Sequence, residues 1–409
     1  MIKIVHTADW HLGQTFMQKS RKEEHQLFIN WLIELIQTEQ IDVVIIAGDI
    51  FDVANPSIEA MDLYHYFLLE AYKLSVEVVI IGGNHDSAAR LNSTGQLLQF
   101  LHVHVVGGDA SALGKIIPLK NKNGQIEAVI VAVPYLRDGD VRKINEGEEV
   151  IEAHHKFALS IQKHYDCLLL QAQQEFPNVQ VIGTAHLYVN GSSLSDPLKE
   201  HMHAIGTLGQ ISTSNFSEGY SYIALGHIHK PQLLKHPKDV KVKYAGSPIA
   251  LSFSERKDQK EITIIEIDHD QLNFSAVSIP VFRMLKRFKG NASKVIQQLS
   301  EINSATHLSV WGEIILTEKV NFIAFNEQIE TICETNNIEI LSRHLELHSE
   351  DQQSVREQYV LGVDNNPLDD IEQIFRIKCE KAGLDQDNIA TIFPLFQSVL
   401  NHVKDFKAV

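Results

Sequence analysis

The residues with the clearest capacity for chemistry in this 409-residue chain are carboxylates, histidines and one asparagine, gathered in five short clusters. Each cluster follows an apolar run rich in β-branched residues that stops at a small residue. In chain order the clusters supply Asp9 and His11, then Asp49, then Asn84, His85 and Asp86, then His186, and finally His227 and His229. Oxygen and imidazole donors without thiolate suit manganese, iron or zinc better than calcium. The set therefore indicates a site for such metal ions.

The chemistry that best fits these ligand types is hydrolysis of a phosphate ester. Two divalent ions about 3.5–4 Å apart would offset charge on the phosphoryl oxygens and make a nucleophile from water at neutral pH. Such a site needs mixed carboxylate, amide and imidazole ligands. The candidates for that set are Asp9, His11, Asp49, Asn84, His186, His227 and His229.

Taken singly, each cluster also has a purely structural interpretation. The Asp9 cluster is compatible with a turn or a helix cap, and Asn84 follows two glycines as an ordinary turn residue does. A lone histidine such as His186 is more often a satisfied core or surface residue. The pair His227 and His229 is more specific, because alternate residues at a strand end point the same way. The order and placement of all five clusters together favour the metal site.

The apolar runs before the clusters predict how these side chains meet. Continuous runs at residues 2–5, 43–46, 78–81, 179–182 and 222–225 suit strands covered on both faces. Helical spacing of apolar residues lies between several of them, as in residues 28–36. We therefore expect an α/β layered domain, in which ligands collect at the carboxyl ends of the strands.

The series Asp-x-His, Gly-Asp, Gly-Asn-His-Asp, His and Gly-His-x-His resembles the calcineurin-like metallophosphoesterase superfamily over roughly residues 1–250. The resemblance implies a core of two sheets flanked by helices and a site for two metal ions. One ion would be held by Asp9, His11, Asp49 and His229, and the other by Asp49, Asn84, His186 and His227. It also implies that His85 acts beside the ions as a general acid or as a hydrogen-bond donor to the transition state, with Asp86 orienting its ring. An imidazole can protonate a departing alkoxide near neutral pH.

Longer segments resemble one branch of that superfamily, the bacterial SbcD nuclease subunits, which correspond to the Mre-eleven nucleases of archaea and eukaryotes. They are Thr-Ala-Asp-Trp-His-Leu-Gly at 7–13, Gly-Asp-Ile-Phe-Asp at 48–52 and Gly-Ser-Pro-Ile-Ala-Leu-Ser-Phe-Ser-Glu at 246–255. This resemblance covers essentially the whole chain. It implies manganese-dependent cleavage of DNA ends, as an exonuclease on duplexes and an endonuclease at hairpins. The archaeal relatives carry a histidine implicated in catalysis where this chain has Asp52, so we expect Asp52 to be structural or to support the ligands.

The same resemblance implies partners and a setting in DNA repair, recombination and replication. The partners would be DNA, a second copy of the chain and an SbcC-type ATPase with a long coiled coil. The sequence has no Gly-x-x-x-x-Gly-Lys-Ser/Thr loop, so ATP would be bound by that ATPase. The densest basic cluster near the catalytic domain could meet DNA phosphates or form a solvated face; it consists of Arg283, Lys286, Arg287 and Lys289.

The chain divides into three predicted parts. Residues 1–280 form the nuclease domain, which ends after residues 261–267, where the alternation is typical of a half-buried strand. Residues 281–348 form a small α+β capping domain, with a helix near 294–299 and strands near 308–316 and 338–347. Residues 349–409 begin as a polar linker and continue as C-terminal helices, for which we favour docking on the ATPase over closing the core.

Composition limits the setting and the partners. A formal net charge of −16 argues against broad electrostatic attraction to DNA, so DNA binding must be local or assisted by metal or a partner. The three cysteines, Cys167, Cys333 and Cys379, lack the close pairing of zinc or disulfide sites. No run approaches the ~18 apolar residues of a membrane span, and the N-terminus lacks a leader pattern. We expect a cytoplasmic, nucleoid-associated protein.

Two other functions are compatible with parts of this pattern. The same ions could serve a phosphatase or cyclic-nucleotide phosphodiesterase with a small substrate, although the capping domain and terminal helices weigh against it. A non-catalytic scaffold could keep the fold for protein binding. Its usual mark is loss of ligands, and every predicted ligand position is retained.

Overall fold

In the computed structural model, residues 1–344 pack as one compact unit and residues 345–409 as a second. The structure describes residues 1–108, 113–142, 150–193, 210–269, 271–302, 308–318, 320 and 322–346. Beyond residue 346 it describes residues 375, 379, 388 and 392–397. The predicted domain boundaries at 280 and 348 stay predictions.

The first unit contains two six-stranded sheets. The first sheet has the order β16-β15-β1-β4-β5-β6, where β1 is Ile2–Thr7, β4 Val43–Ala47, β5 Glu77–Ile81, β6 Val103–Val106, β15 Glu261–Asp268 and β16 Gln271–Ser278. The second has the order β13-β14-β12-β9-β8-β7, where β7 is Lys115–Lys120, β8 Ile126–Ala132, β9 Gln180–His186, β12 Tyr222–Gly226, β13 Gln232–Leu234 and β14 Lys241–Tyr244. In the first sheet β1, β4, β5 and β6 pair in parallel, while β15 and β16 add antiparallel pairs at one edge. In the second sheet β14, β12, β9 and β8 pair in parallel, and the edge strands β13 and β7 are antiparallel to their neighbours.

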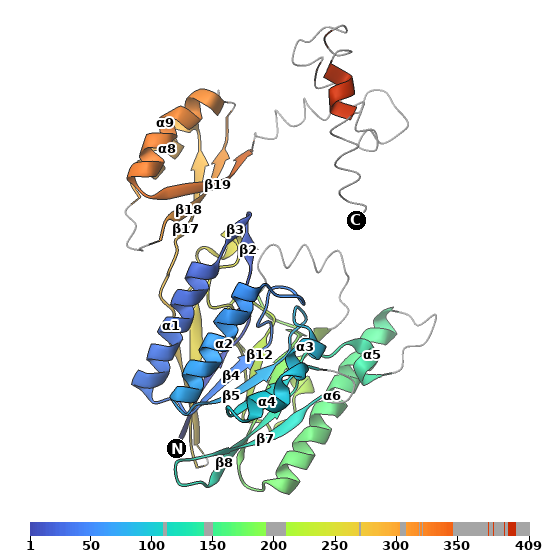
Figure 1. The fold of residues 1–409 in the computed structure, drawn as a ribbon. Coiled ribbons are helices and arrows are strands. Elements are labelled where there is room, and N and C mark those ends of the chain that lie inside the picture. Colours follow the sequence, from blue (N-terminus) through green and yellow to red (C-terminus); the bar gives the residue numbers. More distant parts are fainter. Residues whose placement is uncertain are drawn as a thin grey trace. The chain divides into compact units, whose positions relative to one another are not determined.

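The two sheets face one another and are covered by helices on their outer faces (Figure 1). Side chains such as Ile45, Ile81, Ile130 and Ile182 fill the space between the sheets. The first sheet is covered by α1 (Lys22–Glu39), α2 (Ile58–Lys73), α3 (Ala88–Ser93) and α4 (Gly95–Gln99), and the second by α6 (Val150–Glu175). Both sheets are thus buried on two faces, which explains their continuous apolar runs. The predicted α/β layered fold is confirmed.

Strand β15 corrects one expectation about burial. Its alternation predicted a strand with one solvent-facing side, but Ile262 and Ile264 pack beneath the helices while Ile265 and Ile267 pack between the sheets. The reason is position, because β15 pairs with β1 on one side and with β16 on the other. The half-exposed strand at this edge is β16.

Short elements complete the first unit around this core. They are β2 (Thr15–Phe16), β3 (Lys19–Ser20), α5 (Asp138–Val141), β10 (Tyr188–Val189), β11 (Gln210–Ile211), η1 (Thr213–Asn215) and η2 (Phe253–Glu255). The hairpin of β2 and β3 and the turn η2 lie in segments that meet the small sheet described next.

A three-stranded sheet follows in the order β17-β18-β19. Its elements are β17 (Leu285–Gly290), α8 (Ala292–Ser300), β18 (Val310–Leu316), α9 (Phe322–Thr335) and β19 (Ile338–Leu345). Helix α9 is absent from the sequence-based prediction, although Phe325, Ile329 and Ile332 recur at helical spacing and pack against the sheet. The apolar spacing of α9 is short and no clear capping residues flank it, so there was no strong indication of a helix in the sequence.

The small sheet is joined to the large sheets by an aromatic and ionic contact. Trp311 packs in one cluster with Phe16, Phe253 and Leu285. The guanidinium of Arg283 lies 4.2 Å from the centre of the Trp311 ring. Such stacking of a cation on tryptophan is favourable, and more so when both groups are desolvated.

The described part of the second unit is short. Residues 392–397 are helical, as predicted for the last helix, and the ring centres of Phe375 and Phe396 lie 4.1 Å apart. The predicted helix start at Asn366-Pro367 lies outside the described residues. No described helix is both long enough and apolar enough to cross a membrane. The three cysteines are free thiols.

We predict that Gly226→Ala lowers the free energy of unfolding by about 3 kcal/mol, because overpacking of a dense core costs that order of magnitude. A Cβ at position 226 would lie 1.9 Å from the carbonyl oxygen of Ala47, where β12 of one sheet meets β4 of the other. Urea denaturation of the metal-free protein measures the change. The matched control is Gly95→Ala, because a Cβ there meets nothing within 4 Å. Equal stability of the two variants would contradict this account.

Candidate metal centre

The loops after β1 and β4 are locked together by their backbones. Asp9 N–H donates to the carbonyl of Gly48 at 3.0 Å, and His11 N–H donates to the carbonyl of Asp49 at 3.0 Å. Asp9, His11 and Asp49 all have positive φ angles, of 52°, 47° and 50°. This left-handed conformation is uncommon outside glycine and clusters at functional sites. The strand ends therefore turn sharply and present these side chains at the edge of the sheet.

Glycines allow the strand ends to approach one another. A Cβ on Gly48 would lie 2.3 Å from Nδ1 of His186, and one on Gly83 would lie 2.2 Å from Oδ1 of Asp49. Gly48 also has a φ of +89°, which other residues rarely adopt. The Gly-Asp and Gly-Asn-His-Asp sequences thus owe their glycines to close packing around Asp49.

Asp49 lies at the centre of the arrangement. Its Oδ2 is 3.6 Å from Nε2 of His11 on one side and 3.2 Å from Nε2 of His186 on the other. Its Oδ1 accepts the backbone N–H of His85 at 2.9 Å. Burial opposes ionisation of Asp49, but the His186 ring outweighs it and lowers the pKa of this carboxyl. One carboxylate oxygen is therefore shared between two groups of ligands.

The first group of ligand atoms comes from Asp9, His11 and Asp49, which approach within 4.8 Å of one another. His229 adjoins this group, since its ring centre lies 5.0 Å from that of His11. Oδ2 of Asp9 and Nε2 of His11 are buried and have no hydrogen-bond partner. Buried polar atoms in proteins are normally paired, so these atoms fit a role as ligands of a cation.

The second group comes from Asp49, His186 and His227, again within 4.8 Å of one another. Asn84 joins it, because its Oδ1 lies 3.1 Å from Nε2 of His186 and 2.9 Å from Nδ1 of His227. His186 Nδ1–H donates to the carbonyl of Ala47 at 2.9 Å, which turns Nε2 toward the cluster. A fixed second nitrogen of this kind is typical of metal-binding histidines.

All seven predicted ligands therefore meet at one place, and the described residues there form two adjoining groups. Burial opposes protonation of His186, but the Asp49 carboxylate outweighs it and raises the pKa of the ring to about 9. Burial lowers the pKa of His227 to about 3. In the metal-free site one imidazole is thus charged and its neighbour neutral.

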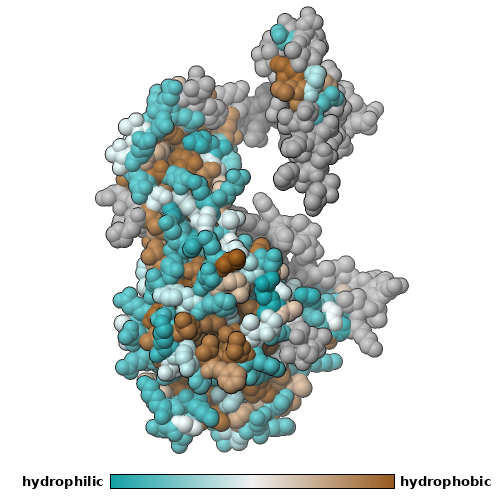
Figure 2. Space-filling view, in the orientation of Figure 1, coloured by the Kyte–Doolittle hydropathy of each residue, from teal (hydrophilic) through white to brown (hydrophobic). Residues whose placement is uncertain are grey.

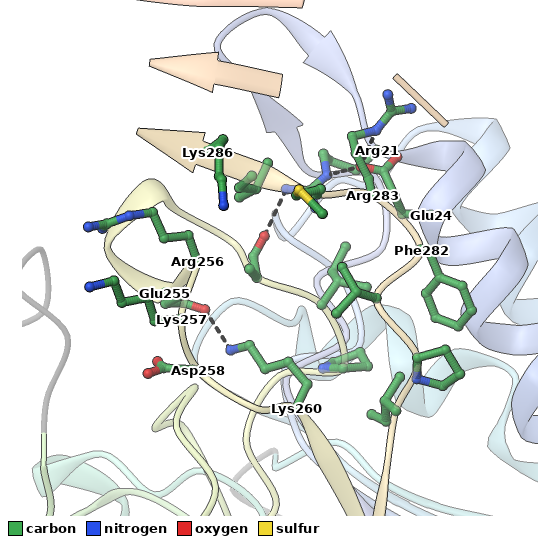
Figure 3. Close-up of a pocket in the computed structure, with 18 of the residues that line it drawn as sticks. Arg21, Glu24, Glu255, Arg256, Lys257, Asp258, Lys260, Phe282, Arg283 and Lys286 are labelled. Carbon is green, nitrogen blue, oxygen red and sulfur yellow. Dashed lines mark hydrogen bonds and ion pairs between the residues drawn. The ribbon is translucent and has the colours of Figure 1, made fainter. Parts of the chain in front are cut away.

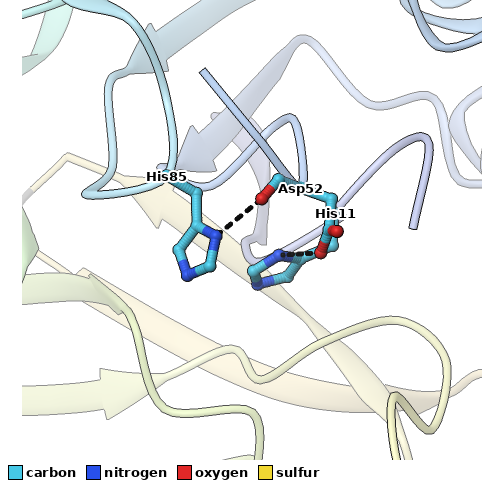
Figure 4. Close-up of side chains that lie close together, drawn as sticks. All are labelled: His11, Asp52 and His85. Carbon is cyan, nitrogen blue, oxygen red and sulfur yellow. Dashed lines mark hydrogen bonds and ion pairs between the residues drawn. The ribbon is translucent and has the colours of Figure 1, made fainter. Parts of the chain in front are cut away.

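His85 lies at the exposed rim of the cluster, and its ring is held differently from the prediction. Nδ1–H of His85 donates to the backbone carbonyl of Asp52 at 2.7 Å, and the Asp52 carboxylate lies 3.2 Å from Nδ1 of His11 (Figure 4). The predicted ring partner, Asp86, does not contact the ring. Asp52 supports both histidines, consistent with the expectation of a supporting role for that residue.

Asp86 instead organises the loops beneath the site. Its carboxylate accepts the backbone N–H groups of Gly83, Ile50 and Phe51 at 2.9, 3.2 and 3.0 Å. Burial and the neighbouring Asp49 charge raise the pKa of Asp86 to about 6. The expectation that Asp86 orients His85 directly is wrong, because its oxygens are taken up by the backbone that carries Asp49 and His85.

Glu255 and Lys260 also belong to the surroundings of the site, although no role was predicted for them. Nδ1–H of His229 donates to Oε1 of Glu255 at 3.2 Å, and Oε2 of Glu255 lies 2.7 Å from Nζ of Lys260. The only sequence signal for Glu255 was its place in segment 246–255, which resembles the SbcD subunits but was given no role at the site. Only the fold shows that it returns to His229.

The predicted basic cluster needs correction. Arg283 is buried, with its Nε 2.9 Å from Glu24 Oε1, and so cannot meet DNA. Arg287 pairs with Glu313. Lys286 and Lys289 are exposed, and Lys286 shares a pocket of about 630 Å³ with Arg256 and Lys257 (Figure 3).

The family model for the calcineurin-like phosphoesterases matches residues 2–231 of this chain. The chain belongs to that family. The match contains every predicted ligand, so the resemblance drawn from the five clusters is confirmed. Together with the buried aspartate and histidine groups, it supports a divalent-metal site of the kind found in dimetal phosphoesterases.

Over 409 residues the chain is 32% identical to the SbcD subunit of the nuclease SbcCD of Escherichia coli (strain K12), with 98% of each protein covered. It is 34% identical over 279 residues to the SbcD subunit of Rhodobacter capsulatus, covering 65% of this chain and 66% of that protein. It is 29% identical over 278 residues to that of Bacillus subtilis (strain 168), with the same coverage. The chain is therefore a homologue of the SbcD nuclease subunits.

We predict that the apparent affinity for Mn²⁺ rises with pH, because an ion must displace the proton of His186, whose pKa is about 9 in the metal-free site. Below pH 9 the His186 ring is protonated. Each further unit by which the pH falls therefore lowers the apparent affinity for Mn²⁺ by up to tenfold through this one proton. Isothermal titration calorimetry from pH 7 to pH 9, in buffers of different ionisation heat, gives both affinity and proton release. A flat profile without proton release would contradict this protonation state.

Proposed function

We propose that this chain is the nuclease subunit of a DNA-end-processing complex and hydrolyses phosphodiesters with two divalent ions, Mn²⁺ foremost. The observation that carries the proposal is the position of Asp49, whose Oδ2 lies between His11 on one side and His186 on the other. A single carboxylate shared by two ligand groups suits a pair of ions. Homology to the SbcD nuclease subunits over 98% of the chain supports DNA as the substrate.

The proposed ligand sets follow the two groups. Asp9, His11, Asp49 and His229 would hold one ion, and Asp49, Asn84, His186 and His227 the other. When bound, such ions polarise a phosphoryl oxygen and lower the pKa of a bound water. The unpaired Oδ2 of Asp9 and the unpaired Nε2 of His11 support the first set.

His85 would supply the proton for the leaving oxygen. Its ring is exposed, and Nδ1–H donates to the carbonyl of Asp52, so Nε2 is left to face a substrate at the rim. The carbonyl acceptor at Nδ1 fixes the direction of the ring, and a general acid must be positioned in this way to reach the leaving oxygen. The backbone N–H of His85 donates to Oδ1 of Asp49, which links the proposed acid directly to the carboxylate shared by the two ligand groups.

DNA phosphates would reach the site along the cations that line one pocket. Arg256 and Lys257 directly follow Glu255, which contacts His229, and lie on the same side of the pocket as Lys286 in Figure 3. Lys289 continues the basic surface on β17. Phosphate contacts by lysine and arginine supply most non-specific DNA affinity. This path replaces the predicted one through Arg283.

The proposed partners are an SbcC-type ATPase and a second copy of the chain. Docking of the ATPase would use the helices in 349–409, most of which lie outside the described residues. For the homodimer, large exposed apolar side chains on and beside α2 and α4 offer a surface, among them Leu69, Leu97 and Phe100. Figure 2 shows a hydrophobic area on the face that carries these helices.

We predict that the purified full chain cleaves end-labelled duplex and hairpin DNA when Mn²⁺ is added, and that Asp49→Ala abolishes cleavage. The variant removes the carboxylate shared by both ligand groups, so neither ion would be held correctly. The products are measured on denaturing gels, with EDTA as the metal-free control.

Identical cleavage by wild type and Asp49→Ala would mean a contaminating nuclease or a wrongly placed site. If wild type cuts nothing alone, the assay is repeated with the ATPase partner. Silence on DNA together with hydrolysis of a chromogenic phosphate monoester would instead indicate a small-substrate phosphoesterase.

We predict that His85→Gln retains Mn²⁺ binding but slows DNA cleavage by about 10²–10⁴-fold, the usual contribution of a general acid. Glutamine keeps a polar side chain but cannot donate a proton at neutral pH. The matched control is His155→Gln, which changes an exposed histidine on α6. Loss of metal, or turnover equal to that of the control, would remove His85 from the acid role.

A further inference from the structure

His229 is held both at its ring and at its backbone. Nδ1–H donates to Oε1 of Glu255 at 3.2 Å. The backbone carbonyl of His229 accepts from Nζ of Lys260 at 2.9 Å and from the N–H of Ser247 at 3.1 Å. With Nδ1 engaged, Nε2 is the ring nitrogen left for the cluster that contains His11. The direction and tautomer of the ring are therefore set before any ion binds.

Glu255 is built into the interior rather than resting on the surface. Only 2% of the residue is exposed, and its Oε2 accepts from Nζ of Lys260 at 2.7 Å and from the N–H of Leu251 at 3.1 Å. Burial opposes ionisation, but the hydrogen bond from His229 and the charge of Lys260 outweigh it and lower the pKa of Glu255. Nζ of Lys260 also contacts the hydroxyl of Ser247 at 2.8 Å. Both oxygens of the Glu255 carboxylate are thus hydrogen-bonded within the interior, Oε1 to His229 and Oε2 to Lys260 and Leu251.

This support differs from that of the other histidines at the site. The rings of His186 and His85 donate from Nδ1 to neutral backbone carbonyls. The carboxylate near His11, that of Asp52, is 29% exposed. His229 faces a carboxylate that is buried and carries its own buried cation. A carboxylate partner fixes the ring and raises the basicity of the free nitrogen, and losing such partners typically costs about 10–100-fold in metal affinity.

The segment that carries Glu255 also supports the small sheet. Nη1 of Arg21 donates to the carbonyl of Ala250 at 2.9 Å, and Phe253 packs in one cluster with Phe16 and Trp311. Glu255, Lys260 and Arg283 line the same pocket (Figure 3). The chain that leads to Glu255 is therefore held in place at Ala250 and Phe253.

We propose that Glu255 is a positioning residue for His229, that it fixes the ring for one of the two ions, and that Lys260 holds the Glu255 side chain in place. The inference rests on the proposed two-metal site. It predicts that the two ions respond differently to a change at Glu255, because only one of the proposed ligand sets contains His229.

The test compares Glu255→Gln with Glu261→Gln in the full chain. Lys260 would attract the amide oxygen of glutamine, so the amide NH₂ would face Nδ1 of His229 and oppose the required tautomer. Glu261→Gln is the matched control, because Oε1 of Glu261 lies 2.7 Å from Nζ of the buried Lys243 and contacts no proposed ligand. A double variant, Glu255→Gln with Lys260→Gln, removes the buried pair together in case the single variant unfolds.

Mn²⁺ alone is titrated by isothermal titration calorimetry, and melting temperatures are recorded without metal. We expect two ions in wild type and in Glu261→Gln. In Glu255→Gln and in the double variant, one ion should bind about 10–100-fold more weakly while the other is unchanged. The difference between the two sites is a result that general destabilisation does not produce.

Two outcomes would overturn the inference while leaving the metal site intact. They are tight binding of both ions by the Glu255 variants, and equal weakening in Glu261→Gln. A wild-type protein that binds fewer than two ions would instead overturn the two-metal proposal itself, and this inference with it.

Discussion

The burial of two carboxylates at one point is the constraint on which the rest of this structure depends. Asp9 and Asp49 are 0% and 2% exposed, and removing an ionised carboxylate from water costs several kcal/mol even after the protein relaxes. Histidines supply the compensation in the metal-free chain, since His186 lies 3.2 Å from Asp49 and gains a raised pKa from it. Protonated histidine offsets the carboxylate charge in the metal-free cluster. Metal ions can take over this role and release the protons when they bind.

The backbone is strained to bring these groups together. Asp9, His11, Asp49 and His227 all adopt positive φ angles, and each such residue costs on the order of 1–3 kcal/mol. Burial of apolar side chains between the two sheets, in a layer behind the site, offsets this strain. Gly226 lets the sheets meet directly above that layer. Stability and function are therefore separated in space, with dense packing on one side of the strand ends and strained, polar turns on the other.

The strands and the meeting of the seven candidate ligands were predictable for one physical reason. A strand covered on both faces is a continuous apolar run, and the polar residue that ends it must lie at the edge of the sheet. What sequence did not reveal depends on contacts across the fold. Every residue has a backbone carbonyl, so the sequence gives no sign that the carbonyl of Asp52 binds His85. Glu255 contacts His229 only because the folded chain returns to the site. Arg283 looked like a DNA contact because its burial against Trp311 is a property of packing, not of composition.

The charge of the chain can be reconciled with DNA as a substrate through the range of electrostatic forces. At physiological salt, charges further than about 8 Å apart are largely screened, so a phosphate senses its neighbours and not the net charge of −16. Near the site those neighbours are Arg256, Lys257 and Lys286, to which bound ions would add positive charge. The acidic remainder supplies no counter-ion release and hence no general affinity for duplex DNA. With the proposed function, such a chain would bind DNA beside the metal site and would depend on partner chains to stay there.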